Sequence, residues 1–448
     1  MKRIIILLSA AFFLILSYFQ QGFCSEKIIQ TRGGTKVFAV QHENGDWELM
    51  VDGKPYFIKG VLFSPVKIGE SPGDATMRDW MYYDDNNNSV NDMAYEVWVD
   101  KNRNNIQDED EKPVGDFQIL KDLGCNTIRL YHLPSDNALL GDIYRHDKSL
   151  QLQYDHAPNK ELLRDLHKTY SIRVIMGTFL GSWTIGAGVP YKEGCDYTNK
   201  QQRENIKKSV QAMVEDHKDE SYVLMWLLGN ENNIATWSQC NARTHIREYY
   251  QLVNEIAKMV HEMDPLHPVA VCEGYIPGDL LLYKKYLTDI DIVAYNAYMG
   301  DAGFHDLWDE TKKLFDRPVF ISEYGLFSYN TIDGVNEEQQ LDYHRGCYID
   351  MMINRAGGKS PVFGKGAGNC IGGVIFDYLD RWYMDGQPSV QNPGNKYWSH
   401  SKDHKDHEEY FGITSMGDGK HNYFKRQLKC AYDFYQKQWT GKAVSSNE

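Results

Sequence analysis

Short apolar, β-branched runs alternate with amphipathic stretches along most of the chain. Eight such runs lie at 56–63, 126–131, 172–179, 222–228, 268–272, 290–296, 318–322 and 372–378. Between them apolar residues recur with helical spacing, as in 201–218, 243–263 and 337–354. Alternation of this kind is typical of a parallel α/β fold. Eight repeats predict a (β/α)8 TIM barrel over residues 56–440 rather than an open doubly wound sheet.

The segment before the barrel has the pattern of short strands. Residues 25–55 contain Gly33-Gly34, and residues 46–51 alternate between polar and apolar side chains before Asp52-Gly53. An Asp-Gly pair after such alternation is a strong hairpin signal. We therefore expect a short N-terminal β-hairpin extension that leads into the barrel.

Two polar insertions interrupt the barrel pattern. Residues 66–113, between the first and second runs, are acidic, and residues 380–415, after the eighth run, are rich in His, Asp, Gly and Asn. In a TIM barrel the segments that follow the strands lie on the catalytic face, where loop variation sets specificity. Both insertions are predicted on that face.

The first 24 residues have the pattern of a signal peptide. A basic start, Met1-Lys2-Arg3, precedes an apolar run from Ile4 to Phe19, and Gly22-Phe23-Cys24 offers small residues for cleavage near Ser25. The pattern predicts a secreted or periplasmic protein. The alternative is an uncleaved membrane anchor, although the run is slightly short for a bilayer span.

Composition narrows the range of partners. The chain has 62 acidic against 48 basic residues, a net charge of -14. This balance argues against nucleic acid, and against a membrane surface as a partner beyond the leader. No glycine-rich phosphate or dinucleotide loop follows any of the eight runs, so no organic cofactor is expected.

Two of the runs end abruptly in a carboxylate. Glu231 closes the fourth predicted strand, and Glu323 closes the seventh. Two carboxyl groups about 5–5.5 Å apart at a barrel rim are the apparatus of retaining glycoside hydrolysis. Glu323 is therefore predicted as the nucleophile and Glu231 as the acid/base. Asn230 is expected to bind the sugar 2-OH, and Tyr298 to donate a hydrogen bond to the nucleophile.

Four motifs resemble those of one enzyme clan. They are Val51-Asp52-Gly53-Lys54-Pro55-Tyr56-Phe57-Ile58-Lys59-Gly60, Asn126-Thr127-Ile128-Arg129-Leu130-Tyr131-His132-Leu133-Pro134, Gly229-Asn230-Glu231 and Ser322-Glu323-Tyr324-Gly325. Together they resemble the TIM-barrel domain of glycoside hydrolase family 2, in the same order. The β-1,3-glucanosyltransferases of family 72 are a close competitor, because they share this pattern without the sandwich domains that usually precede the family 2 barrel.

The resemblance implies roles for further residues. Arg129 is expected to support the nucleophile, and His132 to border the glycone site. Trp382, after the eighth strand, is a predicted sugar platform. Trp183 and Trp237 fall in rim loops, where stacking on sugar and covering the core are equally good interpretations.

The first insertion contains an EF-hand-like calcium pattern. In residues 100–111, oxygen-bearing side chains fall at loop positions 1, 3, 5, 9 and 12, with a backbone carbonyl at position 7. The predicted ligands are Asp100, Asn102, Asn104, Ile106, Asp108 and Glu111. A Ca²⁺ ion there would be structural; the alternative is a solvated acidic loop.

The cysteines suggest one cross-link. Cys195 and Cys240 fall in two successive rim loops and are the best disulfide pair for an oxidising compartment, although the sequence does not fix connectivity.

The combined expectation is a secreted retaining β-glycoside hydrolase that acts on a β-linked oligo- or polysaccharide. Two alternatives stay open: a β-glucanosyltransferase on the same scaffold, and a non-catalytic carbohydrate-binding or envelope-assembly protein. Intact Glu231 and Glu323 speak against the second.

Overall fold

The computed structural model describes residues 27–71, 76–132, 159–362, 364–420 and 422–441. The predicted leader lies outside these residues. None of the helices in the described part of the chain has the length and hydropathy needed to cross a lipid bilayer.

Eight parallel strands close into a barrel, in the spatial order β5-β7-β8-β9-β10-β11-β12-β17. They are β5 (Ile58–Leu62), β7 (Thr127–Leu130), β8 (Arg173–Thr178), β9 (Val223–Leu228), β10 (Val269–Gly274), β11 (Ile292–Asn296), β12 (Val319–Tyr324) and β17 (Cys370–Ile375). Each strand lies within or beside one of the eight predicted runs. The (β/α)8 barrel is therefore confirmed. Almost every strand residue is buried, because helices cover the outside and side chains fill the inside.

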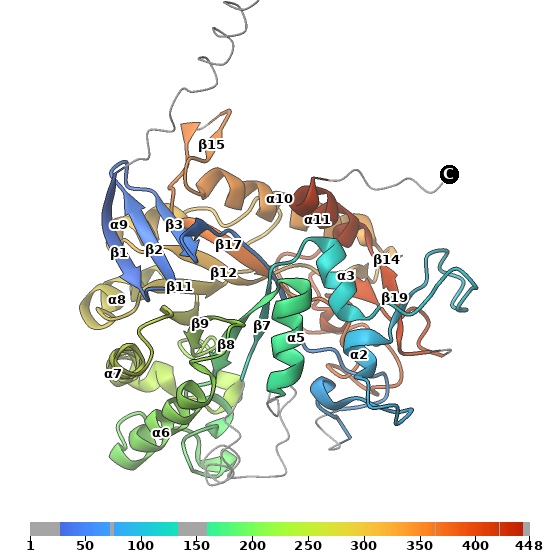
Figure 1. The fold of residues 1–448 in the computed structure, drawn as a ribbon, viewed down its shortest axis with the longest axis horizontal. Helices are drawn as coiled ribbons and strands as arrows, with labels where there is room; N and C mark the ends of the chain where they lie inside the picture. Colours follow the sequence, from blue (N-terminus) through green and yellow to red (C-terminus); the bar gives the residue numbers. More distant parts are fainter. Residues whose placement is uncertain (1–26, 72–75, 133–158, 363, 421, 442–448) are drawn as a thin grey trace, which may run out of the picture.

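Helices follow the strands around the barrel, as Figure 1 shows. They are α3 (Asp116–Leu123), α5 (Lys160–Tyr170), α6 (Lys200–His217), α7 (Ile246–Met263), α8 (Leu280–Tyr286), α9 (Leu307–Leu314), α10 (Glu337–Asn354) and α11 (Cys430–Thr440). Asparagine side chains cap several of their amino ends; Asn199, for example, accepts hydrogen bonds from two backbone N–H groups of α6. Three of these helices coincide closely with the helical stretches predicted at 201–218, 243–263 and 337–354.

An antiparallel sheet precedes the barrel: β1 (Ile28–Gly33), β2 (Val37–His42), β3 (Trp47–Val51) and β4 (Lys54–Pro55). It is larger than the predicted hairpin. The Asp52-Gly53 turn does connect β3 to β4, with both residues at positive φ as a two-residue hairpin loop requires. The sheet lies at the amino ends of the strands, because Val37 N–H bonds Leu266 just before β10 and Trp47 N–H bonds Gly368 just before β17.

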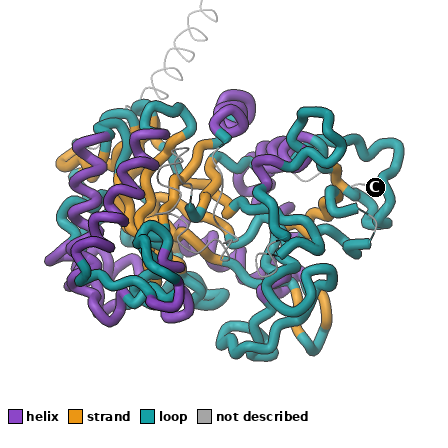
Figure 2. The backbone as a smooth tube through the Cα atoms, turned by 90° about the horizontal axis from the view of Figure 1, so that it is seen from below, coloured by secondary structure: helices purple, strands orange, loops and turns teal. Residues whose placement is uncertain are grey.

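The insertions form the opposite, loop-rich part of the molecule. The first holds η1 (Trp80–Tyr82), α2 (Asp92–Tyr95) and β6 (Trp98–Val99). The last holds η8 (Glu408–Tyr410) and β18 (Thr414–Ser415). β19 (Lys425–Leu428) follows this insertion and pairs with both β18 and β6. Hairpins β13 (Tyr329–Asn330)–β14 (Gly334–Val335) and β15 (Lys359–Ser360)–β16 (Gly364–Lys365) flank α10. Figure 2 shows this loop-rich half beside the helix-ringed strands.

Short helices form the rim near the middle strands. They are η3 (Ser182–Thr184), η4 (Tyr191–Glu193), η5 (Thr236–Ser238), η6 (Ala242–His245) and η7 (Pro277–Asp279). The first three lie in the two connections that follow β8 and β9. The second of these connections contains Glu231, three residues after the end of β9.

Candidate functional site

Glu323 lies on β12 at the carboxyl rim of the barrel, with three donors on its carboxylate. Arg129 Nη1 and Tyr131 Oη donate to Glu323 Oε1 at 2.9 and 2.7 Å. Tyr298 Oη donates to Oε2 at 2.9 Å. The side chain is nearly buried, so these donors replace water and hold the carboxylate in one orientation. The predicted positions of Arg129 and Tyr298 beside Glu323 are thus observed.

The Arg129 guanidinium joins three strands of the barrel interior. Besides Glu323 it donates to Asn296 Oδ1 at 3.2 Å, to the Ser322 carbonyl at 2.8 Å, and through Nη2 to Asn230 Oδ1 at 2.6 Å. Burial alone would lower the pKa of Arg129, but neighbouring Cys272 and Glu323 raise it above its ordinary value. The guanidinium is therefore a fixed positive charge between the two predicted catalytic segments.

Glu231 follows β9 and turns out of the strand. Gly229 has φ 81° and Glu231 itself has φ 56°, so the backbone bends sharply where the strand ends. Burial and the negative charge of Glu323 together raise the pKa of Glu231 to about 8. That electrostatic effect requires the two carboxyl groups to lie near each other at the same rim. At neutral pH Glu231 is thus protonated and can donate a proton.

Asn230 lies against Arg129 and Asn296, and its contact with the sugar 2-OH stays a prediction. Its Oδ1 atom accepts from Arg129 and from Asn296 Nδ2 at 3.1 Å. No described residue accepts a hydrogen bond from its amide NH2 group, so that group is available to a ligand. The backbone N–H of Asn230 is held by Asn232 Oδ1 at 2.9 Å.

Four other predicted residues differ in their exposure. The His132 ring is buried and stacks on Phe179 at 5.6 Å. Trp382 is only 6% exposed, with Gly419 packed against its ring, so sugar stacking there stays a prediction. Trp183 is partly buried and stacks on Tyr191. Trp237 is 55% exposed.

Two residues of the centre escaped the sequence analysis. Tyr131 lies two positions after Arg129, so alternation along the β7 direction could have placed both side chains on the inner face. Asn296 ends β11 and pairs in register with Glu323. Its Oδ1 atom accepts from Ser322 and Arg129. Only the strand register, which the sequence does not give, shows that Asn296 lies level with the carboxylate.

Further charged groups lie beyond β17. Asp377 and Arg381 form a buried ion pair, and burial raises the pKa of Asp377 to about 6 despite the neighbouring cation. Burial also raises the pKa of Glu408 to about 7, and the charge of Glu408 acts in turn on Glu231. The last insertion therefore contributes acidic groups to the same rim.

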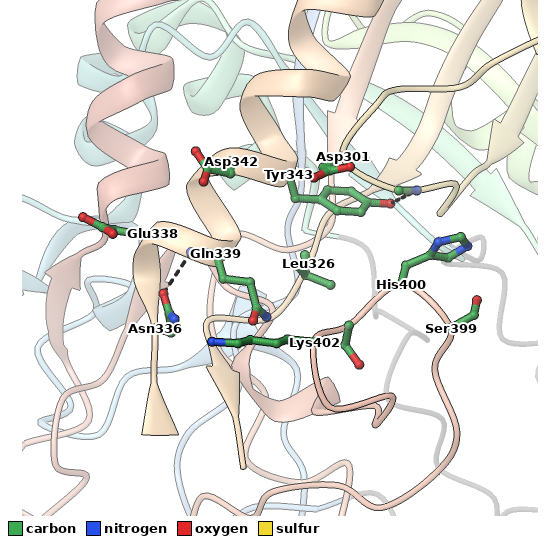
Figure 3. Close-up of a pocket in the computed structure, with 12 residues that line it drawn as sticks. Asp301, Leu326, Asn336, Glu338, Gln339, Asp342, Tyr343, Ser399, His400 and Lys402 are labelled. Atoms are coloured by element: carbon green, nitrogen blue, oxygen red, sulfur yellow. Dashed lines mark hydrogen bonds between the residues drawn. The ribbon is translucent and has the colours of Figure 1, made fainter. Parts of the chain in front are cut away.

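Aromatic rings pack around Tyr298, and residues that follow two of them in the chain line a polar pocket. Tyr298 packs edge-to-face on Trp398 and on Phe411. Directly after Tyr298 and Trp398 in the chain, a pocket of about 550 Å³ opens between the 300–301, 336–343 and 399–402 segments. Figure 3 shows His400 and Ser399 on one side of it, Asp301 and Tyr343 on another, and Lys402 near Asn336 and Gln339.

The predicted calcium loop is folded on itself. Asp100 accepts from the backbone N–H groups of Asn104 and Asn105, and Asn105 has φ 67°, the conformation expected at loop position 6. Asp108 accepts from the amides of Asn102 and Asn104, and Glu111 accepts from Lys101 N–H at 2.6 Å. Gln427 on β19 donates to Asp100 at 2.8 Å and joins the loop to the strand that follows the last insertion.

Across the described ranges, no group of three or more His, Cys, Asp or Glu side chains is arranged to hold a metal ion. An EF-hand-like site also uses amide and backbone oxygens. The calcium assignment therefore stays a prediction.

The fold and the centre define the class: a TIM-barrel protein with two glutamates at the carboxyl ends of its fourth and seventh strands. Residues 152–360 match the family described as "Glycosyl hydrolases family 2, TIM barrel domain". The resemblance predicted from the motifs is thus confirmed over these residues, which contain the Glu231 and Glu323 motifs.

Individual relatives agree with this assignment. The chain is 28% identical to a beta-mannosidase of Rattus norvegicus over 156 residues, which cover 31% of this chain and 17% of the relative. It is 21% identical to a beta-glucuronidase of Streptococcus agalactiae serotype V over 281 residues, 59% of this chain and 40% of the relative. The chain thus spans less than half the length of either curated relative.

One solved structure shares the fold, and a second is reported beside it as similar. A calcium binding mutant of Bacteroides uniformis beta-glucuronidase 2 matches 90% of this chain and 39% of its own, with a TM-score of 0.50 and 13% identity. A beta-D-glucuronidase of Dictyoglomus thermophilum matches 91% of this chain and 57% of its own, with a TM-score of 0.49 and 15% identity.

Proposed function

We propose that this protein is a retaining β-glycoside hydrolase that cleaves a β-linked oligo- or polysaccharide. The observation that carries the proposal is the pair formed by Glu323, which holds three donors, and Glu231, whose pKa is raised to about 8. Two carboxyl groups with environments this different are suited to opposite roles in one reaction.

In the first step, Glu323 attacks the anomeric carbon while Glu231 protonates the departing glycosidic oxygen. A covalent glycosyl–enzyme and a free leaving group result. In the second step, the now ionised Glu231 takes a proton from water, and the resulting hydroxide displaces Glu323. Arg129, Tyr131 and Tyr298 hold the Glu323 carboxylate for in-line attack. Asn230 can donate its free amide hydrogens to the sugar 2-OH, a contact that strengthens in the transition state.

The rim favours a saccharide as the leaving group. Trp183, Tyr191 and Trp237 gather in the connections that follow β8 and β9, on the side of Glu231; Tyr191 Oη donates to the Trp237 carbonyl at 3.2 Å. Aromatic faces there can stack on the sugar that Glu231 protonates.

Two further properties belong to the proposal. The basic and apolar leader supports export from the cytoplasm. The 100–111 loop, with its EF-hand-like spacing and the left-handed Asn105, supports a structural Ca²⁺ ion that joins β6 to β19.

A trapping experiment tests the proposal. The mature protein is incubated with a panel of nitrophenyl β-glycosides and with β-linked oligosaccharides, and then with the matching 2-deoxy-2-fluoro glycosides. We expect turnover of at least one substrate and a covalent sugar on Glu323, located by peptide mass analysis. Glu323→Gln should lose both signals.

The products distinguish the alternatives. Products longer than the starting oligosaccharide would indicate glycosyl transfer to sugar instead of water. Saccharide binding without turnover, unchanged in Glu323→Gln, would overturn the enzymatic proposal in favour of a binding protein.

A further inference from the structure

We propose that Cys195 and Cys240 form a disulfide bond in the exported protein. The bond would connect the rim loop after β8 to the rim loop after β9. The two sulfurs are not bonded in the structure, but the backbone around them already lies as a cross-link requires.

The two loops approach each other backbone to backbone. Cys195 N–H donates to the Gln239 carbonyl at 2.9 Å, and Asn241 Nδ2 donates to the Cys195 carbonyl at 3.2 Å. Cys195 is thus hydrogen-bonded to both neighbours of Cys240. A side chain at Gly194 would collide with Asn241, which shows how closely the loops pack. A disulfide needs its two Cα atoms within about 7 Å, a condition that this pairing favours.

The side chains converge on the same point. Tyr197 Oη lies 3.1 Å from Cys240 Sγ and interacts with the Cys195 thiol as well. Each thiol also acts electrostatically on its surroundings: Cys240 is among the causes that raise the pKa of Cys195, after burial. Both cysteines are essentially inaccessible, at 1% and 0% exposure.

The turn that presents Cys240 is strained. Gln239 and Asn241, on either side of it, have φ 52° and 58°. Non-glycine residues with such φ values cost free energy, and two of them flanking one residue need compensating interactions. A covalent bond from Cys240 to the facing loop would supply one.

The reaction is a thiol–disulfide exchange. Two S–H bonds break and one S–S bond forms; the two electrons and two protons released reduce the disulfide of an oxidising partner, such as oxidised glutathione, to two thiols. Burial raises the pKa of both thiols, and the reactive form is the thiolate. The exchange therefore belongs to folding, before the loops close over the sulfurs.

Peptide mapping tests the bond directly. The full chain is exported by a host with an oxidising periplasm, purified without reductant, alkylated in denaturant and digested. We expect a linked pair of peptides that carry residues 195 and 240, two hydrogen masses lighter than their sum, while the other mature cysteines are alkylated. Refolding the reduced chain with oxidised and reduced glutathione should give the same pair.

Thermal unfolding supplies a second readout. Reductant should lower the melting temperature of the wild type by about 5 °C. It should leave Cys195→Ser/Cys240→Ser unchanged. Cys430→Ser, on α11, serves as the control and should respond like the wild type. Full alkylation of both cysteines after export and after oxidative refolding would overturn the proposal, whatever the enzyme assays show.

Discussion

At the scale of single residues, the centre depends on the different surroundings of two glutamate side chains, Glu323 and Glu231. Glu323 is surrounded by one guanidinium and two phenol groups, whereas Glu231 loses water and has a negative neighbour. Desolvation and like charge both favour the neutral carboxylic acid, and donors favour the carboxylate. The difference in environment supports the proposed roles, with Glu231 as the acid/base and Glu323 as the nucleophile.

The raised pKa of Glu231 predicts the alkaline limit of activity. Glu231 is protonated below about pH 8 and loses its proton above it. We therefore expect kcat/KM for substrates with sugar leaving groups to fall as the pH rises through about 8. Glu231→Gln should lose roughly 10²–10⁴-fold on such substrates, and much less on dinitrophenyl glycosides, whose leaving group needs no proton. Initial-rate measurements over pH 5–10 check this.

Glu231→Gln should also change how the stability of the folded protein depends on pH. Because the folded pKa of Glu231 lies above its value in the unfolded chain, the native state binds more protons between about pH 4.5 and 8, and stability falls as pH rises through that window. Glu231→Gln should therefore melt at a higher temperature than the wild type at pH 9. The control is Glu215→Gln, because Glu215 is exposed on α6, and this variant should melt at the same temperature as the wild type. Equal melting temperatures for all three proteins would contradict the raised pKa of Glu231.

At the scale of elements, polar contacts hold the 100–111 loop of the first insertion to its surroundings. This loop, the predicted calcium loop, packs on β19 through Gln427 and on α10 through the Arg103–Glu337 ion pair. The loop thus connects three segments far apart in the sequence.

Calcium binding should stabilise this arrangement. An ion present at about 100 times its Kd would add about 2.7 kcal/mol to the free energy of unfolding. We expect EDTA to lower the melting temperature and excess Ca²⁺ to restore it, while the pH profile of activity stays the same. Asp100→Asn with Glu111→Gln should remove the response. An EDTA-insensitive wild type would exclude the ion.

The two rim loops after β8 and β9 predict a substrate-length effect. Trp237→Ala should raise KM for β-linked oligosaccharides about tenfold, equal to about 1.4 kcal/mol, because an exposed stacking face is lost. Hydrolysis of nitrophenyl monosaccharides should be unaffected. Tyr82→Ala removes a comparably exposed ring from the first insertion and is the control. An equal loss on both kinds of substrate would show that Trp237 supports the fold instead.

At the scale of the whole molecule, different parts of the chain cover the two ends of the barrel. The β1–β4 sheet covers the amino ends of the strands, and the insertions and acidic residues occupy the carboxyl ends. Trp47 on β3 is fully buried, and its Nε1 atom donates to Asp316 at 2.7 Å, just before β12.

Removing this ring should destabilise the molecule without changing its chemistry. Trp47→Ala should lower the free energy of unfolding by about 3–5 kcal/mol, as large-to-small changes in a core do. The kcat of the folded fraction should match the wild type, since the sheet lies away from the carboxyl rim. Ile29→Ala, 55% exposed on β1, should change stability by less than about 0.5 kcal/mol. Denaturant unfolding followed by tryptophan fluorescence measures both.

The sequence by itself determined the barrel and the two strands that lead to a glutamate. Buried parallel strands must be apolar along their length and helices must have one apolar face, so eight repeats are visible in the pattern. The same reasoning placed Glu231 and Glu323 at strand ends, and the resemblance to family 2 placed Arg129 beside the nucleophile.

Tertiary structure decided what depends on register and on side-chain environment. Asn296 lies level with Glu323 only because of the β11–β12 pairing, and the proton affinity of Glu231 reflects burial and a neighbour 92 positions away in the chain. The approach of Cys195 to Cys240 arises in the same way, from backbone bonds between separate loops. Local patterns encode which face of an element is apolar; they do not encode the distances between elements, on which electrostatics and covalent cross-links depend.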